Sequence, residues 1–269
     1  MTVLKVSANV KMLEKSIGDH PKYSSQNKGW NSKRLIRKDE WPMLRTVGIS
    51  GLREQDGQEL TVEDLAVLIR DQLVTWPLRG GERIFEAQIA RDMEVSRPLV
   101  REACRVLESE GLLVYTQNKG FALKRLTREE VLHLVEFRII LEEAAFVAAA
   151  SLEDRTEVVD QMRKAYQGIE MACITEDPAR QISADVAFHR VVIEHTGNPW
   201  ILHSFDRMST QFRYAIRLMS RSLNDFKVYA PSHIVLIDYV EQGNAQLARE
   251  EINRHIRMFL PNLLKRIKE

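Results

Sequence analysis

The 269-residue sequence predicts a mainly α-helical protein: a small domain of three helices and a β-hairpin, followed by a larger domain of helices alone. Two observations predict this class. Apolar residues recur at helical spacing from Thr61 onward, and one pair of short β-like segments interrupts that pattern. The composition, 44% hydrophobic and 29% charged, is typical of a packed globular protein and excludes a chain that is disordered throughout.

Membrane and secreted classes are not supported by the sequence. No apolar run approaches the ~20 residues that a membrane-spanning helix needs, and the densest run, residues 139–150, contains Glu142 and Glu143. The N-terminal residues lack the apolar segment of a secretory signal, and the two cysteines, Cys104 and Cys173, lie far apart. We therefore expect a cytoplasmic protein with no membrane partner.

Residues 1–60 are expected to form a flexible basic N-terminal extension, because they show no sustained helical periodicity and end in a polar, glycine-containing stretch. The net charge of the chain is only +1, but residues 1–45 hold ten Lys or Arg and four Asp or Glu. A solvated leader is the simpler interpretation of this extension. Binding to DNA phosphates is the alternative.

Residues 61–126 are expected to form the small domain. Thr61 and Asp64 are spaced as a capping box that opens a first helix, and a second helical pattern covers residues 86–93. A third helix opens at Ser96, whose hydroxyl can cap it. The segments LLVYT and FALK then predict two strands, joined by a turn that ends at Gly120. Three helices followed by a hairpin is the order of a winged helix-turn-helix.

The third predicted helix has a face suited to DNA. Arg97, Arg101 and Arg105 recur every four residues and share one side, and the opposite side is apolar. Arginine can bind guanine or a phosphate with two hydrogen bonds, and Lys119 and Gly120 of the hairpin can approach the DNA backbone. For three arginines alone, a solvated helix face is the simpler interpretation. Combined with the order of elements, the pattern favours double-stranded DNA as the partner.

Residues 127–269 are expected to form an all-α domain of about six helices of about 15–25 residues. Thr127 and Glu130 are spaced as a capping box. Prolines that follow a capping residue or open a helix mark further starts, at Pro178, Pro199 and Pro231.

Asp185 and His189 are four residues apart and share one helical face, which is a spacing that can bind one divalent cation. His233 and His255 lie among apolar residues of two later helices. One aspartate and three histidines suit zinc, nickel, manganese or iron. On spacing alone, hydrogen-bonded core histidines remain the leading interpretation.

The small domain resembles the winged helix-turn-helix of the GntR superfamily of bacterial repressors. The matching residues are Leu78-x-x-Gly81, Ala90, Val95-Ser96-Arg97-x-x-Val100-Arg101-Glu102-Ala103 and Leu107-Glu108-x-x-Gly111-Leu112. The resemblance implies that Ser96, Arg97 and Arg101 contact operator DNA, together with the wing around Gly120.

The second domain resembles the FadR-type C-terminal ligand-binding (FCD) domain of the same superfamily, in its metal-containing branch. The matching residues are Arg138-x-x-Leu141-Glu142, Ala144-Ala145, Ala148-Ala149, Asp185-x-x-x-His189, Gly197-Asn198-Pro199, Ser232-His233 and His255. The resemblance implies that Asp185, His189, His233 and His255 bind one divalent cation, and that a small carboxylate effector completes the coordination. Arg138 is a candidate to bind that effector, because a buried guanidinium needs a partner. Arg213 is a weaker candidate.

The sequence therefore predicts a homodimeric transcription regulator that responds to an effector and acts as a repressor. It does not predict an enzyme. The alternatives are a metal-dependent hydrolase or lyase, which would use the cation as a Lewis acid, and a sensor of the metal itself. Motifs of serine hydrolases, nucleotide-binding loops and dinucleotide-binding folds are not seen in the sequence. The effector, the operator and the regulated genes are not predicted.

Overall fold

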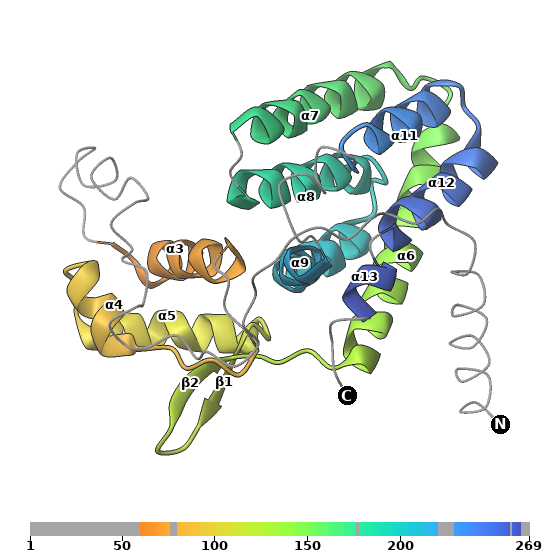
Figure 1. The fold of residues 1–269 in the computed structure, drawn as a ribbon. Coiled ribbons are helices and arrows are strands. Elements are labelled where there is room, and N and C mark those ends of the chain that lie inside the picture. Colours follow the sequence, from red (N-terminus) through yellow and green to blue (C-terminus); the bar gives the residue numbers. More distant parts are fainter. Residues whose placement is uncertain (1–59, 76–79, 176–177, 220–228, 259, 265–269) are drawn as a thin grey trace. The chain divides into compact units, whose positions relative to one another are not determined.

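The structure is a computed structural model that describes residues 60–75, 80–175, 178–219, 229–258 and 260–264. The predicted N-terminal extension therefore lies outside the described residues, except for Leu60. The described part is mostly helical with one two-stranded sheet, which confirms the predicted fold class (Figure 1). None of its helices is long and apolar enough to cross a membrane.

The first group of elements is a winged helix-turn-helix. Its elements are α3 (Val62–Thr75), α4 (Glu86–Asp92), α5 (Arg97–Ser109), β1 (Leu113–Thr116) and β2 (Gly120–Leu123). The capping box at Thr61 is confirmed, because the Asp64 backbone N–H donates to Thr61 Oγ1 at 3.1 Å and Asp64 Oδ2 accepts from the Thr61 N–H. Ser96 caps α5 as predicted and accepts from the Leu99 N–H at 3.3 Å.

The core of this unit forms where α5 packs on α3 and on strand β1. Leu65 and Ile69 of α3, Val100 and Leu107 of α5, and Phe121 of β2 are fully or almost fully buried. The strands pair antiparallel, with Tyr115 opposite Phe121. Gly120 has φ +79°, a conformation that favours glycine and that the QNKG turn predicts. The apolar face of α5 is thereby buried in the core of this unit, and its opposite face is exposed to solvent.

The second group of elements is helical throughout. It comprises α6 (Arg128–Ala150), α7 (Thr156–Thr175), α8 (Pro178–Glu194), α9 (Pro199–Met219), α11 (Ser232–Glu241), α12 (Ala245–Arg257) and α13 (Leu260–Leu264). The predicted capping box of Thr127 and Glu130 opens α6. The predicted length of about 15–25 residues is wrong for α11 and α12, which have 10 and 13 residues. A turn at Gly243, where φ is +68°, ends α11 early.

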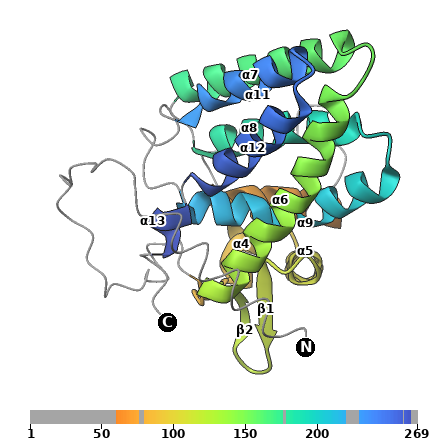
Figure 2. The ribbon, with the colours of Figure 1, turned by 90° about the vertical axis from the view of Figure 1, so that its right-hand side faces the viewer.

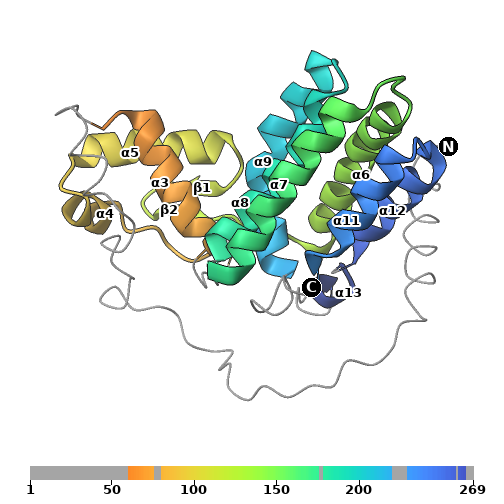
Figure 3. The ribbon, with the colours of Figure 1, turned by 90° about the horizontal axis from the view of Figure 1, so that it is seen from above.

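Helix α6 is central in this bundle, because it packs against α8, α9, α11 and α12. Figures 1 and 2 show α12 running along α6, and Figure 3 shows α7 beside α8. The pairs α11 with α12 and α11 with α7 also pack together. Side chains from α6, α8, α11 and α12 can therefore meet inside the bundle.

Candidate functional site

The predicted reading face of α5 is exposed. Arg97 and Arg101 are solvent-exposed, and the side that carries Val100 and Leu107 is buried. Ser96 is exposed at the N-terminal end of the helix. The helix therefore presents two exposed guanidinium groups on a backbone that the core keeps rigid, which is the requirement for reading base edges in a major groove.

Arg105 differs from the other two arginines because it is half-buried against the hairpin. Its guanidinium carbon lies 4.2 Å from the Tyr115 ring centre and 5.1 Å from that of Phe121, and its Nη1 lies 2.6 Å from Glu108 Oε2. These contacts tie α5 to the wing. Arg105 is thus better placed to hold the wing than to reach a base.

Tyr115 is a residue of this interface that sequence reasoning missed. Its hydroxyl accepts a hydrogen bond from Arg101 Nη2 at 3.2 Å, and its ring packs on Phe121 with a centroid distance of 5.1 Å. The signal in the sequence was an aromatic residue in the first strand opposite Phe121. At the tip of the hairpin, Lys119 is exposed and Gly120 lies directly beside it.

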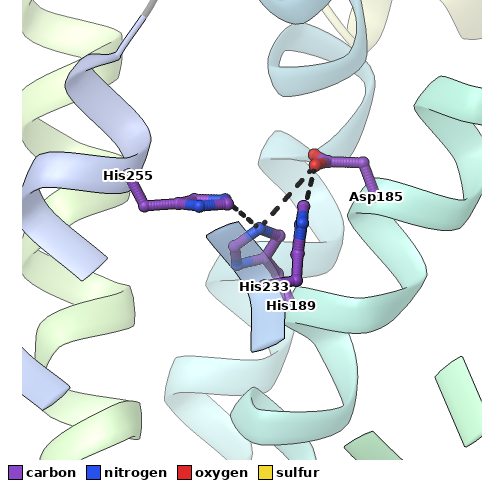
Figure 4. Close-up of side chains that lie close together, drawn as sticks. All are labelled: Asp185, His189, His233 and His255. Carbon is purple, nitrogen blue, oxygen red and sulfur yellow. Dashed lines mark hydrogen bonds and ion pairs between the residues drawn. The ribbon is translucent and has the colours of Figure 1, made fainter. Parts of the chain in front are cut away.

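The four residues of the predicted metal site come together inside the helical bundle. Asp185 and His189 project from α8, His233 from α11 and His255 from α12, and none is more than 1% exposed. One ligand atom from each residue lies within 4.8 Å of the others. Figure 4 shows the carboxylate and the three imidazoles pointing toward one another.

Each imidazole of this group has an oxygen close to its Nδ1 atom, with hydrogen-bond geometry for His233 and His255. The His189 Nδ1 lies 2.6 Å from Glu142 Oε2, and the His233 Nδ1 lies 3.1 Å from the carbonyl oxygen of Ala230. The His255 Nδ1 lies 2.9 Å from Oγ of Ser232, whose own hydrogen goes to the Tyr229 carbonyl oxygen. An Nδ1 that donates to such oxygens leaves the Nε2 lone pair of a neutral imidazole facing inward.

The inward atoms lie close to one another, and the Tyr229 hydroxyl also contacts His255 Nε2. His189 Nε2 and His255 Nε2 are 3.2 Å apart, and His233 Nε2 is 3.2 Å from Asp185 Oδ1. Within the described residues, both Asp185 oxygens and His233 Nε2 are buried without a hydrogen-bond partner. Facing lone pairs in a buried site repel, and a cation between them removes the repulsion. The donor set therefore fits a divalent metal ion.

The protonation states of the group agree with this fit. Burial lowers the pKa of His233, and it lowers that of His255 well below the ordinary value, so both imidazoles favour the neutral form that binds metals. Burial by itself would raise the pKa of Asp185, but the adjacent His233 and nearby positive charge bring it to about 2. One carboxylate and three neutral imidazoles are the ligands that zinc, nickel, manganese and iron accept.

Arg138 lies beside this centre on α6. It is 4% exposed, its Nε lies 2.5 Å from Glu142 Oε1, and its Nη2 lies 3.7 Å from Asp185 Oδ2. It also borders a small apolar pocket with Phe212 and Ile256. The buried guanidinium thus already has a partner in Glu142, which sequence reasoning did not assign to the site although the i to i+4 spacing in an apolar helix was visible.

The other predicted residues lie elsewhere. Arg213 Nη2 contacts Asp71 Oδ1 at 2.6 Å and Ser183 Oγ at 3.0 Å, so the structure does not bring it to the four ligand residues. His195 bonds through Nδ1 to the Val191 carbonyl oxygen, and His203 is exposed. Neither histidine belongs to the ligand group.

A winged helix-turn-helix with an exposed arginine face, joined to an all-helical bundle, defines a DNA-binding transcription regulator. The family model "Bacterial regulatory proteins, gntR family" matches residues 61–123, and the model "FCD domain" matches residues 133–258. The chain therefore contains a GntR-family helix-turn-helix domain followed by an FCD domain. This confirms the family predicted from the sequence, and with it a regulator rather than an enzyme.

Relatives with known names agree with this assignment. The chain is 25% identical to the uncharacterized HTH-type transcriptional regulator YdhC of Bacillus subtilis, over 70% of this chain and 84% of that protein. It is 20% identical to the gluconate operon transcriptional repressor of Bacillus licheniformis, over 83% of this chain and 88% of that one. A solved structure of a GntR regulator from Rhodococcus shares the fold, with a TM-score of 0.66, 20% identity, and coverage of 77% of this chain and 99% of that chain.

Proposed function

We propose that the chain is an effector-responsive repressor that binds operator DNA through residues 61–126 and a small carboxylate through residues 127–269. The observation that carries the DNA-binding half is the exposed pair Arg97 and Arg101 on a helix whose other face is buried. The repressor role is supported by the gluconate operon repressor among the relatives. Homodimers are expected, because two winged units bind a palindromic site with matching symmetry.

The regulatory half of the proposal depends on the metal centre. Asp185, His189, His233 and His255 hold one divalent cation, either zinc, nickel, manganese or iron. When bound, the cation supplies a positive charge and open ligand positions that a carboxylate can occupy. Support comes from the close approach of these buried, inward-facing atoms and from Asp185 Oδ1, Asp185 Oδ2 and His233 Nε2, which have no hydrogen-bond partner among the described residues.

Arg138 is proposed as the protein's own contact to the effector. Its Nη2 is buried without a hydrogen-bond partner within the described residues and lies on the side of Asp185. A carboxylate that approaches the cation would therefore meet a second positive group. Arg213 is left out of this proposal because its guanidinium already contacts Asp71 and Ser183.

The DNA-binding proposal is tested by selection from a pool of duplexes with a randomised centre. Purified full-length protein is expected to enrich an inverted repeat and to bind it at least about 1,000-fold more tightly than a random duplex. Half-sites separated by a whole number of helical turns would support the homodimer. Enrichment of no common sequence would contradict the proposal. The selection is repeated with a chelator. A change in DNA binding on removal of the metal alone, without any effector, would indicate a sensor of the metal itself.

The N-terminal extension is tested by removing residues 1–45. If its ten basic side chains bind phosphates, the slope of log K against log salt concentration should become shallower by about 0.9 for each phosphate that the shortened protein no longer neutralises. The measurement is a salt titration of affinity for the selected duplex, with full-length protein as reference. Equal slopes mean that the extension is a passive leader.

A further inference from the structure

Glu142 is a fully buried carboxylate on α6 that contacts both the metal centre and Arg138. Its Oε2 lies 2.6 Å from His189 Nδ1, and its Oε1 lies 2.5 Å from Arg138 Nε. Its side chain is 0% exposed. Burial by itself would raise the pKa of Glu142, but Arg138 and His189 lower it.

Stability alone does not account for this arrangement. Burying a carboxylate and a guanidinium costs desolvation free energy that their attraction offsets only in good geometry, and apolar side chains of similar size often serve a core as well. Both charged residues nevertheless stand in α6, the helix that packs against α8, α9, α11 and α12. Each oxygen of Glu142 lies within 2.6 Å of a nitrogen whose side chain borders the same centre.

We propose that Glu142 is a positioning residue that orients His189 toward the metal and Arg138 toward the carboxylate effector. With Nδ1 of His189 only 2.6 Å from Oε2, the Nε2 side of the ring faces the other ligands. With Nε of Arg138 held by Oε1, the Nη2 group stays on the side of Asp185, at 3.7 Å from Oδ2. One carboxylate thereby links metal binding to the orientation of the effector contact. This inference rests on the metal centre proposed above.

The expected consequence of losing Glu142 is a metal site with one poorly oriented ligand. Substitution of groups that orient metal-binding histidines typically lowers metal affinity about 10–100-fold. Glu142→Ala should show a loss of this size. Glu142→Gln should lose less, because an amide oxygen can still accept from His189 Nδ1. A purely packing role would instead predict full recovery by glutamine, which has the same size and shape as glutamate.

The experiment titrates metal-free, full-length protein with zinc in competition with a chelating dye. Wild type, Glu142→Ala and Glu142→Gln are compared with Glu143→Gln, a matched control at the neighbouring position. Glu143 is half-buried and accepts a hydrogen bond from Asn253 Nδ2 at 2.6 Å, and it is not one of the four grouped residues. Thermal unfolding of each metal-free variant checks folding. If Glu142→Ala fails to fold, the comparison of zinc affinity is made between wild type and Glu142→Gln.

A second measurement reports orientation without metal. In protein labelled with ¹⁵N-histidine, the ring signals of His189 should show the hydrogen on Nδ1 in the wild type and a mixture of tautomers in Glu142→Ala. Unchanged zinc affinity and an unchanged tautomer in a folded Glu142 variant would overturn this inference and leave the metal centre standing. A wild type that binds no zinc, nickel, manganese or iron would overturn both.

Discussion

Replacing His233 and His255 together by alanine is expected to abolish metal binding and the response to a carboxylate effector. The two imidazoles come from α11 and α12, whereas Asp185 and His189 come from α8, so the cation joins three helices. After the double substitution only two ligands on one helix remain. A metal that binds only the folded state stabilises it by mass action, by about 4 kcal/mol when free metal exceeds its Kd about 1,000-fold.

The measurements are elemental analysis of protein purified without chelator and thermal unfolding with and without chelator. Chelation should lower the Tm of the wild type and leave the Tm of the double variant unchanged. His203→Ala is the matched control, because His203 is an exposed histidine outside the ligand group. The double variant should keep its basal DNA affinity, since its reading helix is intact. Sub-stoichiometric metal in the wild type, even after reconstitution with zinc, nickel, manganese or iron, would contradict the metal site. The histidines would then be hydrogen-bonded core residues.

Replacing Arg101 by alanine is expected to remove most of the affinity for the selected operator. Arg101 is exposed on α5, and its Nη2 is held by the Tyr115 hydroxyl at 3.2 Å, which orients the guanidinium outward from the apolar face. Loss of a bidentate base interaction costs about 1–3 kcal/mol of binding free energy. Folding should be unaffected, because the side chain supports no part of the core.

Mobility-shift titrations at matched salt measure this effect on the selected duplex and on a random one. Arg101→Ala should lose affinity mainly for the selected duplex. Arg163→Ala serves as control, because Arg163 is an exposed arginine of α7 whose described partner is Glu241. Equal loss on both duplexes would assign Arg101 to a phosphate instead of a base. Unchanged affinity on both would contradict the assigned reading face.

Local sequence determined where α5 and α6 begin. Ser96 caps α5, and Thr127 with Glu130 opens α6, as the spacing alone predicts. A cap needs only residues within about three positions of one another, so the required groups are always adjacent in the chain. Helical spacing likewise determined that Asp185 and His189 share a face and that Val100 and Leu107 are buried.

Only part of the ligand group could be predicted from the sequence. Spacing paired Asp185 with His189, and the family resemblance added His233 and His255. Only the packing of α8, α11 and α12 brought one atom from each residue within 4.8 Å of the others. Contacts between residues far apart in the chain depend on how helices pack, and a one-dimensional pattern does not specify that packing.

Side-chain roles were decided by tertiary structure in the same way. Arg105 shares a helix face with Arg101, but the hairpin places the Tyr115 ring 4.2 Å from its guanidinium, so that Arg105 packs on the wing. Glu142 was visible only as a charge in an apolar helix, and its interaction with His189 exists because α6 packs against α8. Sequence determines which faces a helix has; the neighbour that each face meets is settled only when distant helices bury their apolar surfaces together.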